Sequence, residues 1–336
     1  MRILLGAILI LVAVWSGYWH VSSAAITNGF AAWFGARQNE GWLAEYSEIE
    51  TRGFPNRFDT TISDVTIADP EARIAWESPF FQILALSYKP NHLIAVWPSE
   101  QTATTPSGKY LIASEDMKAS IVLDANAEGE PLFRRVTYRA DNLSVRSETD
   151  EREIRAASIV LAAESAPAHV ATYRIGVEAA EISPAISLLS AIDSSLKLPD
   201  SFEALHVDAR VAFDRPWGRS SIESARPQPK NIKLNKAAAQ WGRLEIKAAG
   251  ELEIDGAGMP AGEIVVKATN WREILNLAVS SGIFKEGHSE ILEPLLSSVA
   301  RLKGNPNTLD IPFTFRNGLI WFKFIPLGPS PVISLR

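Results

Sequence analysis

The second half of the chain alternates apolar and charged residues over long stretches. In residues 241–255 (WGRLEIKAAGELEID) the apolar positions share one parity and most charged positions share the other. Residues 202–214 and 262–269 repeat this alternation. Because successive side chains of a strand point to opposite faces, each segment predicts a β-strand with one apolar face and one charged face.

Weaker period-two patterns predict further strands, which begin near residue 58. These strands are expected at 58–67, 72–77, 81–88, 92–98, 109–113, 117–124, 132–140, 142–148, 153–163, 168–179, 308–316 and 318–325. Apolar residues at helical spacing predict helices at 183–196, 270–282 and 288–303. Strands therefore greatly outnumber helices in the predicted body.

This imbalance determines the predicted fold class, which is α+β and mainly antiparallel β. An N-terminal transmembrane helix is expected to precede a large curved sheet with a few covering helices. The apolar face must leave water, which contributes about 25 cal/mol per Å². A few helices cannot cover the apolar face of roughly fifteen strands. The sheet is therefore expected to curl into a trough, a sandwich or a partial barrel.

Nine aliphatic residues are predicted to line the apolar face of this sheet. They are Leu205, Val207, Val211, Leu244, Ile246, Leu252, Ile254, Ile264 and Val266. A trough that stays open would bind an acyl chain or another apolar ligand along them. The alternative interpretation is ordinary core, because aliphatic side chains at strand spacing usually pack against protein.

An apolar helix is predicted at the N-terminus. Residues 3–19 carry no charge and would form a helix about 26 Å long, close to the ~30 Å hydrocarbon core of a bilayer. Trp15, Tyr18 and Trp19 lie at its C-terminal end and are predicted to anchor it at the membrane interface. Arg2 favours an N-inside orientation with an exported body. The alternative is a cleaved signal peptide that leaves a soluble protein.

Three regions follow from these patterns. Residues 1–22 are the predicted transmembrane signal-anchor, and residues 23–50 are a predicted juxtamembrane amphipathic helix that docks on the body or lies along the membrane. Residues 51–336 form the predicted β-rich body. A repeated order of strand, helix and strand predicts two similar halves in this body, with a boundary near 180–200.

Composition narrows the functional classes. The net charge is −6 and both signs are interspersed, so no basic stripe is present for nucleic acid. The chain contains no cysteine, which excludes disulfides, thiol catalysis and thiolate metal sites. Its five histidines are far apart, and neither the HExxH nor the GxSxG motif occurs. We therefore predict no catalytic residue, no metal ligand and no cofactor.

Four segments carry a family resemblance: RGFP (52–55), SPFFQILALSYKPNHLIAVWP (78–98), GELEIDGAGMPAGEIVVKATNWREIL (250–275) and IPFTFRNGLIWFKFIPLGPSP (311–331). Together they resemble an uncharacterised bacterial envelope family, domain of unknown function 2125. The resemblance implies an inner-membrane protein of Gram-negative bacteria whose body faces the periplasm, and it supplies no catalytic residues. The glycine-separated amphipathic strands are also similar to the large AsmA-like proteins, which are associated with phospholipid transport between membranes.

Two functional hypotheses remain open from the sequence. The first is a membrane-anchored periplasmic protein, not an enzyme, that binds, shields or transfers an apolar, lipid-like molecule. The second is a structural or scaffolding component of an envelope complex with no small-molecule ligand. The expected partners are membrane lipid at the N-terminal helix, an apolar ligand in the sheet and an envelope protein.

Overall fold

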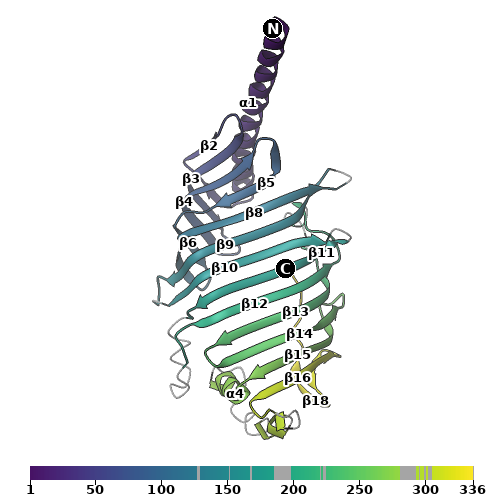
Figure 1. The fold of residues 1–336 in the computed structure, drawn as a ribbon. Coiled ribbons are helices and arrows are strands. Elements are labelled where there is room, and N and C mark those ends of the chain that lie inside the picture. The colour runs from purple at the N-terminus through teal and green to yellow at the C-terminus, as the bar shows by residue number, and fades with distance from the viewer. Residues whose placement is uncertain are drawn as a thin grey trace. The chain divides into compact units, whose positions relative to one another are not determined.

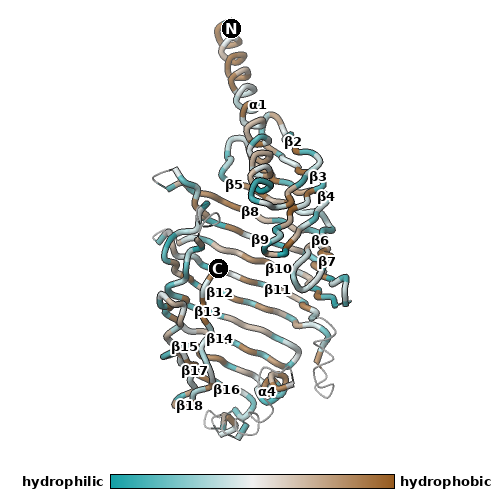
Figure 2. The backbone as a smooth tube through the Cα atoms, turned by 180° about the vertical axis from the view of Figure 1, so that it is seen from behind, coloured by the Kyte–Doolittle hydropathy of each residue, from teal (hydrophilic) through white to brown (hydrophobic). Residues whose placement is uncertain are grey.

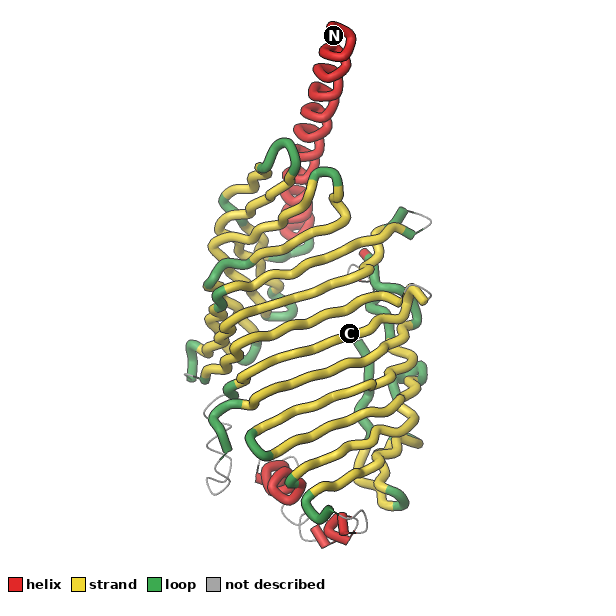
Figure 3. The backbone as a smooth tube through the Cα atoms, viewed as in Figure 1, coloured by secondary structure: helices red, strands yellow, loops and turns green. Residues whose placement is uncertain are grey.

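The computed structural model describes residues 1–126, 129–150, 152–166, 169–184, 198–219, 221, 225–280, 293–294, 296–298, 300–301 and 305–335. These residues form a long N-terminal helix and eighteen strands (Figures 1 and 3). The neighbouring strands whose register is described pair antiparallel. The predicted fold class, mainly antiparallel β with few helices, is confirmed.

The chain divides into two compact units. Unit 1 comprises Met1–Leu123 and Tyr138–Glu151, and unit 2 comprises Asp124–Thr137 and Arg152–Arg336. The two similar halves of the body that the sequence predicts, with a boundary near 180–200, stay a prediction. Residues 185–197 of that predicted boundary lie outside the described part of the chain.

Unit 1 combines the helix with short and long strands. Its elements are α1 (Arg2–Asn39), β1 (Leu43–Glu45), β2 (Glu48–Arg52), β3 (Arg57–Asp69), β4 (Ile74–Leu86), β5 (Lys89–Val96), β6 (Glu100–Thr105), β7 (Gly108–Ala113), most of β8 (Asp116–Ala125) and the second part of β9 (Pro131–Ser147). Strand β3 pairs with β1, β2 and β4, and β4 continues to β5 and β6. Helix α1 packs on β1, β2 and β3.

The predicted amphipathic helix over residues 23–50 is only partly correct. Helix α1 runs without a break from Arg2 to Asn39, so the predicted transmembrane segment and the first part of the predicted amphipathic helix belong to one helix. The prediction is wrong for the second part of this range, because the residues there form strands β1 and β2. Gly41 has a φ of 87° directly after the helix, and Ala44 pairs with Ile67 and is fully buried. Pairing with β3 therefore overrides the helical spacing of the apolar residues.

Over its described residues, unit 2 is a meander of strands with the short helix α4 and a few further helical residues between 293 and 301. Its elements are β10 (Glu153–Ala166), β11 (His169–Ile182), β12 (Phe202–Phe213), β13 (Pro229–Trp241), β14 (Leu244–Ile254), β15 (Pro260–Thr269), α4 (Trp271–Ser280), β16 (Thr308–Arg316), β17 (Leu319–Phe322) and β18 (Ile325–Pro329). From β10 to β18, each strand pairs antiparallel with the next. Figure 2 shows β10–β16 as successive strands of one layer.

Helix α4 confirms the predicted helix at 270–282 over its described residues. The helix predicted at 183–196 lies outside the described residues beyond Pro184. Of the helix predicted at 288–303, the structure describes 293–294, 296–298 and 300–301, and these residues are helical.

Glycine at position 262 is required by the close approach of β14 and β15. Its φ is 143°, and a Cβ added there would lie 2.2 Å from the carbonyl oxygen of Glu251. We expect Gly262→Ala to destabilise unit 2 by about 3 kcal/mol or more, because the strained backbone and the backbone clash add together. Urea unfolding of the full chain in detergent, followed by tryptophan fluorescence, measures this change.

Gly176 in β11 is the matched control for this substitution. A Cβ added at Gly176 meets no atom within 4 Å, and its φ is not in the left-handed region. Gly176→Ala is therefore expected to leave stability unchanged or to raise it by a few tenths of a kcal/mol. Equal destabilisation by the two substitutions would contradict the requirement at position 262.

Candidate functional site

An apolar groove in unit 1 lies between α1 and the strands beneath it, and we call it the helix–sheet groove. Its volume is about 840 Å³. Helix α1 lines it with residues three and four positions apart, which lie on one helical face. The lining residues are Tyr18, Ser22, Ala25, Ile26, Gly29, Phe30, Trp33, Phe34, Phe58, Thr60, Ile62, Val65, Ile67, Trp76, Phe81, Ile83, Ala85, Pro90 and Leu93.

Hydrogen bonds within the protein occupy two of the polar groups along this groove. The Tyr18 hydroxyl donates to the carbonyl oxygen of Ser87 at 2.8 Å. The Thr60 hydroxyl lies 2.9 Å from that of Thr51, which in turn lies 3.1 Å from that of Thr27. Because these groups are already paired within the protein, apolar side chains dominate the surface that the groove offers.

The groove is only partly covered. Ala25 and Gly29 are exposed, and Trp33 is 43% exposed, so α1 leaves part of the lining open to solvent. The core beside the groove is well packed, because Phe34, Ala44, Ile62 and Val65 form one buried cluster. Phe34, Ile62 and Val65 belong both to this buried cluster and to the lining of the groove.

The three residues predicted as membrane-interface anchors connect α1 to the loops of the sheet. The indole Nε1–H of Trp15 donates to the Pro55 carbonyl oxygen at 3.0 Å, and that of Trp19 donates to the Arg57 carbonyl oxygen at 2.8 Å. Trp15 and Tyr18 are 36% and 41% exposed, whereas Trp19 is only 6% exposed. All three therefore help to hold α1 on unit 1, and their position at a membrane interface stays a prediction.

Helix α1 is long and apolar enough to be a signal sequence or a membrane anchor. Its first part carries large exposed apolar side chains, including Ile3, Leu9 and Val14. Figure 2 shows this apolar stretch extending beyond the strands of unit 1. The exposed stretch and the docked stretch thus belong to the same continuous helix.

The nine predicted lining residues share one face of the unit 2 sheet. Directly opposite residues of paired strands lie on the same face, so the register defines rows across the sheet. One row is Leu161, Val177, Val207, Ala237, Ala248, Val266 and Ile311. A second row is Ile159, Ala179, Leu205, Ala239, Ile246, Ala268 and Leu309. The predicted continuous apolar face therefore exists from β10 to β16.

Burial along this face varies between its ends and its centre. Leu244, Leu252, Ile254 and Val211 are buried. Leu205, Val207, Ile264 and Val266 are half-buried, and Ile246 is 37% exposed. The face has neither the uniform burial of a closed core nor the exposure of a free surface, so ligand lining by these nine residues stays a prediction.

A second apolar cavity lies where α4 packs on this face, and its volume is about 190 Å³. The predicted residues Ile246 and Val266 line it, together with Trp271 of α4. Trp271 is 2% exposed, and its Nε1–H donates to the Pro306 carbonyl oxygen at 3.0 Å. Helix α4 therefore closes one end of the apolar face, and the cavity beneath it is much smaller than the helix–sheet groove.

The opposite face of unit 2 carries paired charges. Arg174 donates from Nε to Oδ1 of Asp208 and from a terminal nitrogen to Oδ2, both at 3.0 Å. These hydrogen bonds lower the pKa of Asp208 below its ordinary value. Lys247 and Glu245 form a further ion pair, with Nζ and Oε1 2.6 Å apart. Such exposed pairs are typical of a solvated sheet face.

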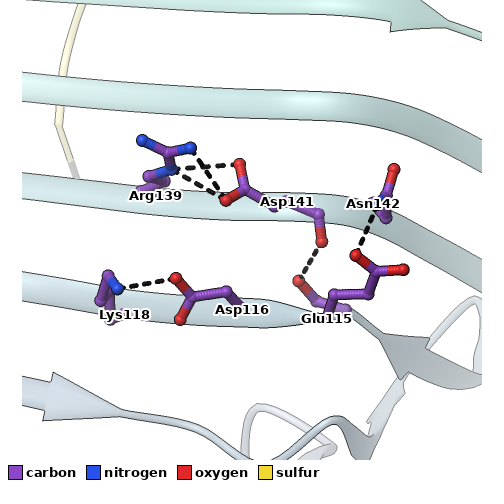
Figure 4. A network of polar contacts seen from close by, with 7 residues as sticks. Glu115, Asp116, Lys118, Arg139, Asp141 and Asn142 are labelled. Atoms are coloured by element: carbon purple, nitrogen blue, oxygen red, sulfur yellow. Dashed lines mark hydrogen bonds and ion pairs between the residues drawn. The ribbon is translucent and has the colours of Figure 1, made fainter.

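Unit 1 has a similar surface network on β8 and β9 (Figure 4). Arg139 donates from Nε to both carboxylate oxygens of Asp141, at 3.1 and 3.0 Å, and Lys118 pairs with Asp116 at 2.6 Å. Asn142 donates to Oε2 of Glu115 at 2.8 Å. The Arg139–Asp141 and Lys118–Asp116 pairs each join two residues of one strand and are partly exposed, as is typical of a solvated sheet face.

The described histidines are dispersed. The Nε2 of His92 lies 2.9 Å from the Ser120 hydroxyl, and the Nδ1 of His206 lies 3.5 Å from Oε1 of Glu178 on the charged face. His288 lies outside the described residues. Among the described residues, no group of three or more histidine and acidic side chains is placed to hold a metal ion. The prediction that the protein is not an enzyme stays a prediction.

Comparison with known proteins gives a family and no closer relative. The model of the family described as "Uncharacterized protein conserved in bacteria (DUF2125)" matches residues 19–331. No curated protein and no solved structure matches the chain. The matched range includes α1 from Trp19 onward, the lining of the helix–sheet groove apart from Tyr18, and the apolar face of unit 2. Because the match covers most of the chain, the protein belongs to the DUF2125 family.

Proposed function

We propose that the protein binds a lipid-like apolar molecule in the helix–sheet groove, as a membrane-anchored and non-catalytic component of the periplasm. The observation that supports this proposal is the groove itself. Its volume of about 840 Å³ lies within the ~300–1,000 Å³ range of ligand pockets, and its lining is almost wholly apolar. An acyl chain fits both this chemistry and the elongated course of the groove beside α1.

The length of the groove favours a chain-like ligand. Its lining on α1 extends from Tyr18 to Phe34, about 24 Å along the helix. The hydrocarbon of one bilayer leaflet is about 15 Å thick. A groove of this length accommodates an extended acyl chain better than a compact ring system.

The proposed location follows from α1. In the proposal, the apolar stretch after Arg2 crosses the inner membrane with its N-terminus inside, and the body lies in the periplasm. The same helix then lines the groove, so membrane and ligand site are joined by one rigid element. The apolar face of unit 2 supplies a second surface of the same chemistry, where the ligand could be shielded or passed on.

Lipid analysis of the purified full chain tests this proposal. The protein is exchanged from one detergent into another and extracted, and the extract is examined by mass spectrometry. We expect a lipid in a stoichiometric amount. A photoactivatable diazirine fatty acid should also cross-link to the α1 peptide that contains residues 22–34, and unlabelled fatty acid should compete. A lipid-free preparation with no competed cross-link would contradict the proposal and favour the scaffolding alternative.

A further inference from the structure

Two loops of unit 1 lie at one end of the sheet, and we call them the tip. They are residues 53–56, between β2 and β3, and residues 87–88, between β4 and β5. The hydrogen bonds from Trp15 to Pro55 and from Tyr18 to Ser87 join the tip to α1. A third bond connects Trp19 to Arg57 at the start of β3. The tip is therefore fixed at the level of helix residues 15–19.

The length of the apolar run places this level inside a bilayer. A helix that crosses ~30 Å of hydrocarbon uses about 20 residues, so a span that starts after Arg2 ends near residue 22. Only about 20 Å of helix separates Ile3 from Trp15. Consequently, the tip cannot stay in water while the charge-free run lies fully in hydrocarbon.

The side chains of the tip suit this position. Phe54 and Tyr88 are 51% and 65% exposed. Large aromatic side chains favour the boundary between hydrocarbon and headgroups. Arg52 and Lys89 are exposed beside the tip, where anionic lipid headgroups attract cations. The acidic partner Glu50 lies further along β2 and forms an ion pair with Arg52.

We propose that the tip docks on the bilayer, with Phe54 and Tyr88 among the headgroups and upper acyl chains of the leaflet on the side of the body. Tyr18 both bonds the tip and lines the helix–sheet groove, so this docking brings one end of the groove to the hydrocarbon. An acyl chain can then enter the groove without crossing water. The inference rests on the membrane-anchor part of the proposed function and is independent of whether a lipid occupies the groove.

The absence of cysteine from the chain allows a direct test with single-cysteine variants. Leu9→Cys, Phe54→Cys, Tyr88→Cys and Glu71→Cys of the full chain are labelled with the fluorophore NBD and placed in vesicles of phosphatidylethanolamine and phosphatidylglycerol. Glu71 is the matched control, because it is exposed in the turn at the opposite end of the β3–β4 hairpin, about 40 Å along the strand. Quenching by spin-labelled lipid and by aqueous iodide reports the depth of each label.

We expect the labels at positions 54 and 88 to shift to the blue and to be quenched by shallow spin-labelled lipid, whereas the label at position 71 is quenched by iodide. The label at position 9 should respond to a deep lipid quencher. If position 9 is in hydrocarbon but positions 54 and 88 respond as position 71 does, the tip does not dock and the inference is overturned. If position 9 is also in water, the proposed anchor itself fails, and the inference fails with it.

All four positions are exposed, so misfolding is not expected, and folding is checked independently. The variants labelled at positions 9, 71 and 88 should keep the urea unfolding midpoint of the unlabelled protein, whereas Phe54→Cys should lower it slightly because it loses the ring contact with Trp19. Val21→Cys, at a residue that is 72% exposed on α1 beyond the tip, serves as a depth ruler and should lie close to the membrane surface. A depth at position 21 that exceeds the depth at position 54 would also overturn the proposed docking.

Discussion

Trp19→Ala is expected to release α1 from the sheet of unit 1 at a cost of about 3–5 kcal/mol. The Trp19 side chain is 6% exposed, and its ring stacks on Phe58 with a centroid distance of 5.8 Å. It also contacts Phe54 edge to face at 5.5 Å. The substitution removes these contacts together with the hydrogen bond to the Arg57 carbonyl oxygen. Amide hydrogen exchange over α1 residues 21–39 and urea unfolding in detergent measure the effect.

Two substitutions separate packing from hydrogen bonding at this contact. Trp19→Phe keeps most of the ring contact and loses the indole donor, so it should cost about 1–3 kcal/mol. Trp15→Ala removes a more exposed side chain that is bound to Pro55, and it should cost about 1 kcal/mol. Faster exchange in α1 is expected to follow the same order. Unchanged exchange in Trp19→Ala would show that this residue does not fix the helix.

The alternation of apolar and charged residues predicted the sheet of unit 2 because side-chain direction in a strand depends only on parity. Leu244, Ile246, Leu252 and Ile254 have one parity, and the register places them on one face. The burial of each residue depends on what covers that face. Trp271 packs in one buried cluster with Ala268 and Leu309, yet Ile246 beside it is 37% exposed while Leu252 is buried. Nothing in the local pattern distinguishes Ile246 from Leu252. The sequence therefore predicts the face but not its occupant.

Irregular pairing limited the prediction elsewhere. Strand β13 was not predicted, because its pairing with β14 shifts register between Leu234 and Ala237, and its apolar residues change parity there. Ile232 and Leu234 are even-numbered, whereas Ala237, Ala239 and Trp241 are odd-numbered. A β-bulge hides an amphipathic strand in this way. The extra residue keeps the apolar side chains on one face of the sheet, but it breaks the alternation of apolar and polar residues in the sequence.

The helix–sheet groove was not predicted because its two walls follow different periods. The residues of the helical wall recur every three or four positions, as in Ala25, Gly29 and Trp33. This spacing is typical of an amphipathic helix that docks on other elements. The residues of the strand wall recur at every second position, as in Phe58 and Ile62. This spacing is typical of an ordinary buried strand face. Only the spatial pairing of α1 with β3 leaves a volume between them. The signal available in the sequence was the pair of small residues Ala25 and Gly29 on the helical face, because small side chains leave space beside a helix.

Gly29→Trp is expected to fill the helix–sheet groove and to weaken the binding of a fluorescent fatty acid by about tenfold or more, which corresponds to about 1.4 kcal/mol. Gly29 lines the groove, and a Cβ added there meets no atom within 4 Å. A residue other than glycine inside a helix also removes a backbone entropy cost of up to about 1 kcal/mol. The indole should therefore occupy ligand space without unfolding the helix.

Gly35→Trp is the matched control, because Gly35 lies on the same helix, has the same free space around an added Cβ and does not line the groove. It should retain fatty-acid binding and the lipid that co-purifies with the protein. Similar losses in both variants, or none in either, would contradict the groove as the ligand site. Loss in Gly29→Trp alone, with an unchanged unfolding midpoint, would place the ligand between α1 and β3. The tip docking would stay intact in both variants, so the entry route and the binding site are tested separately.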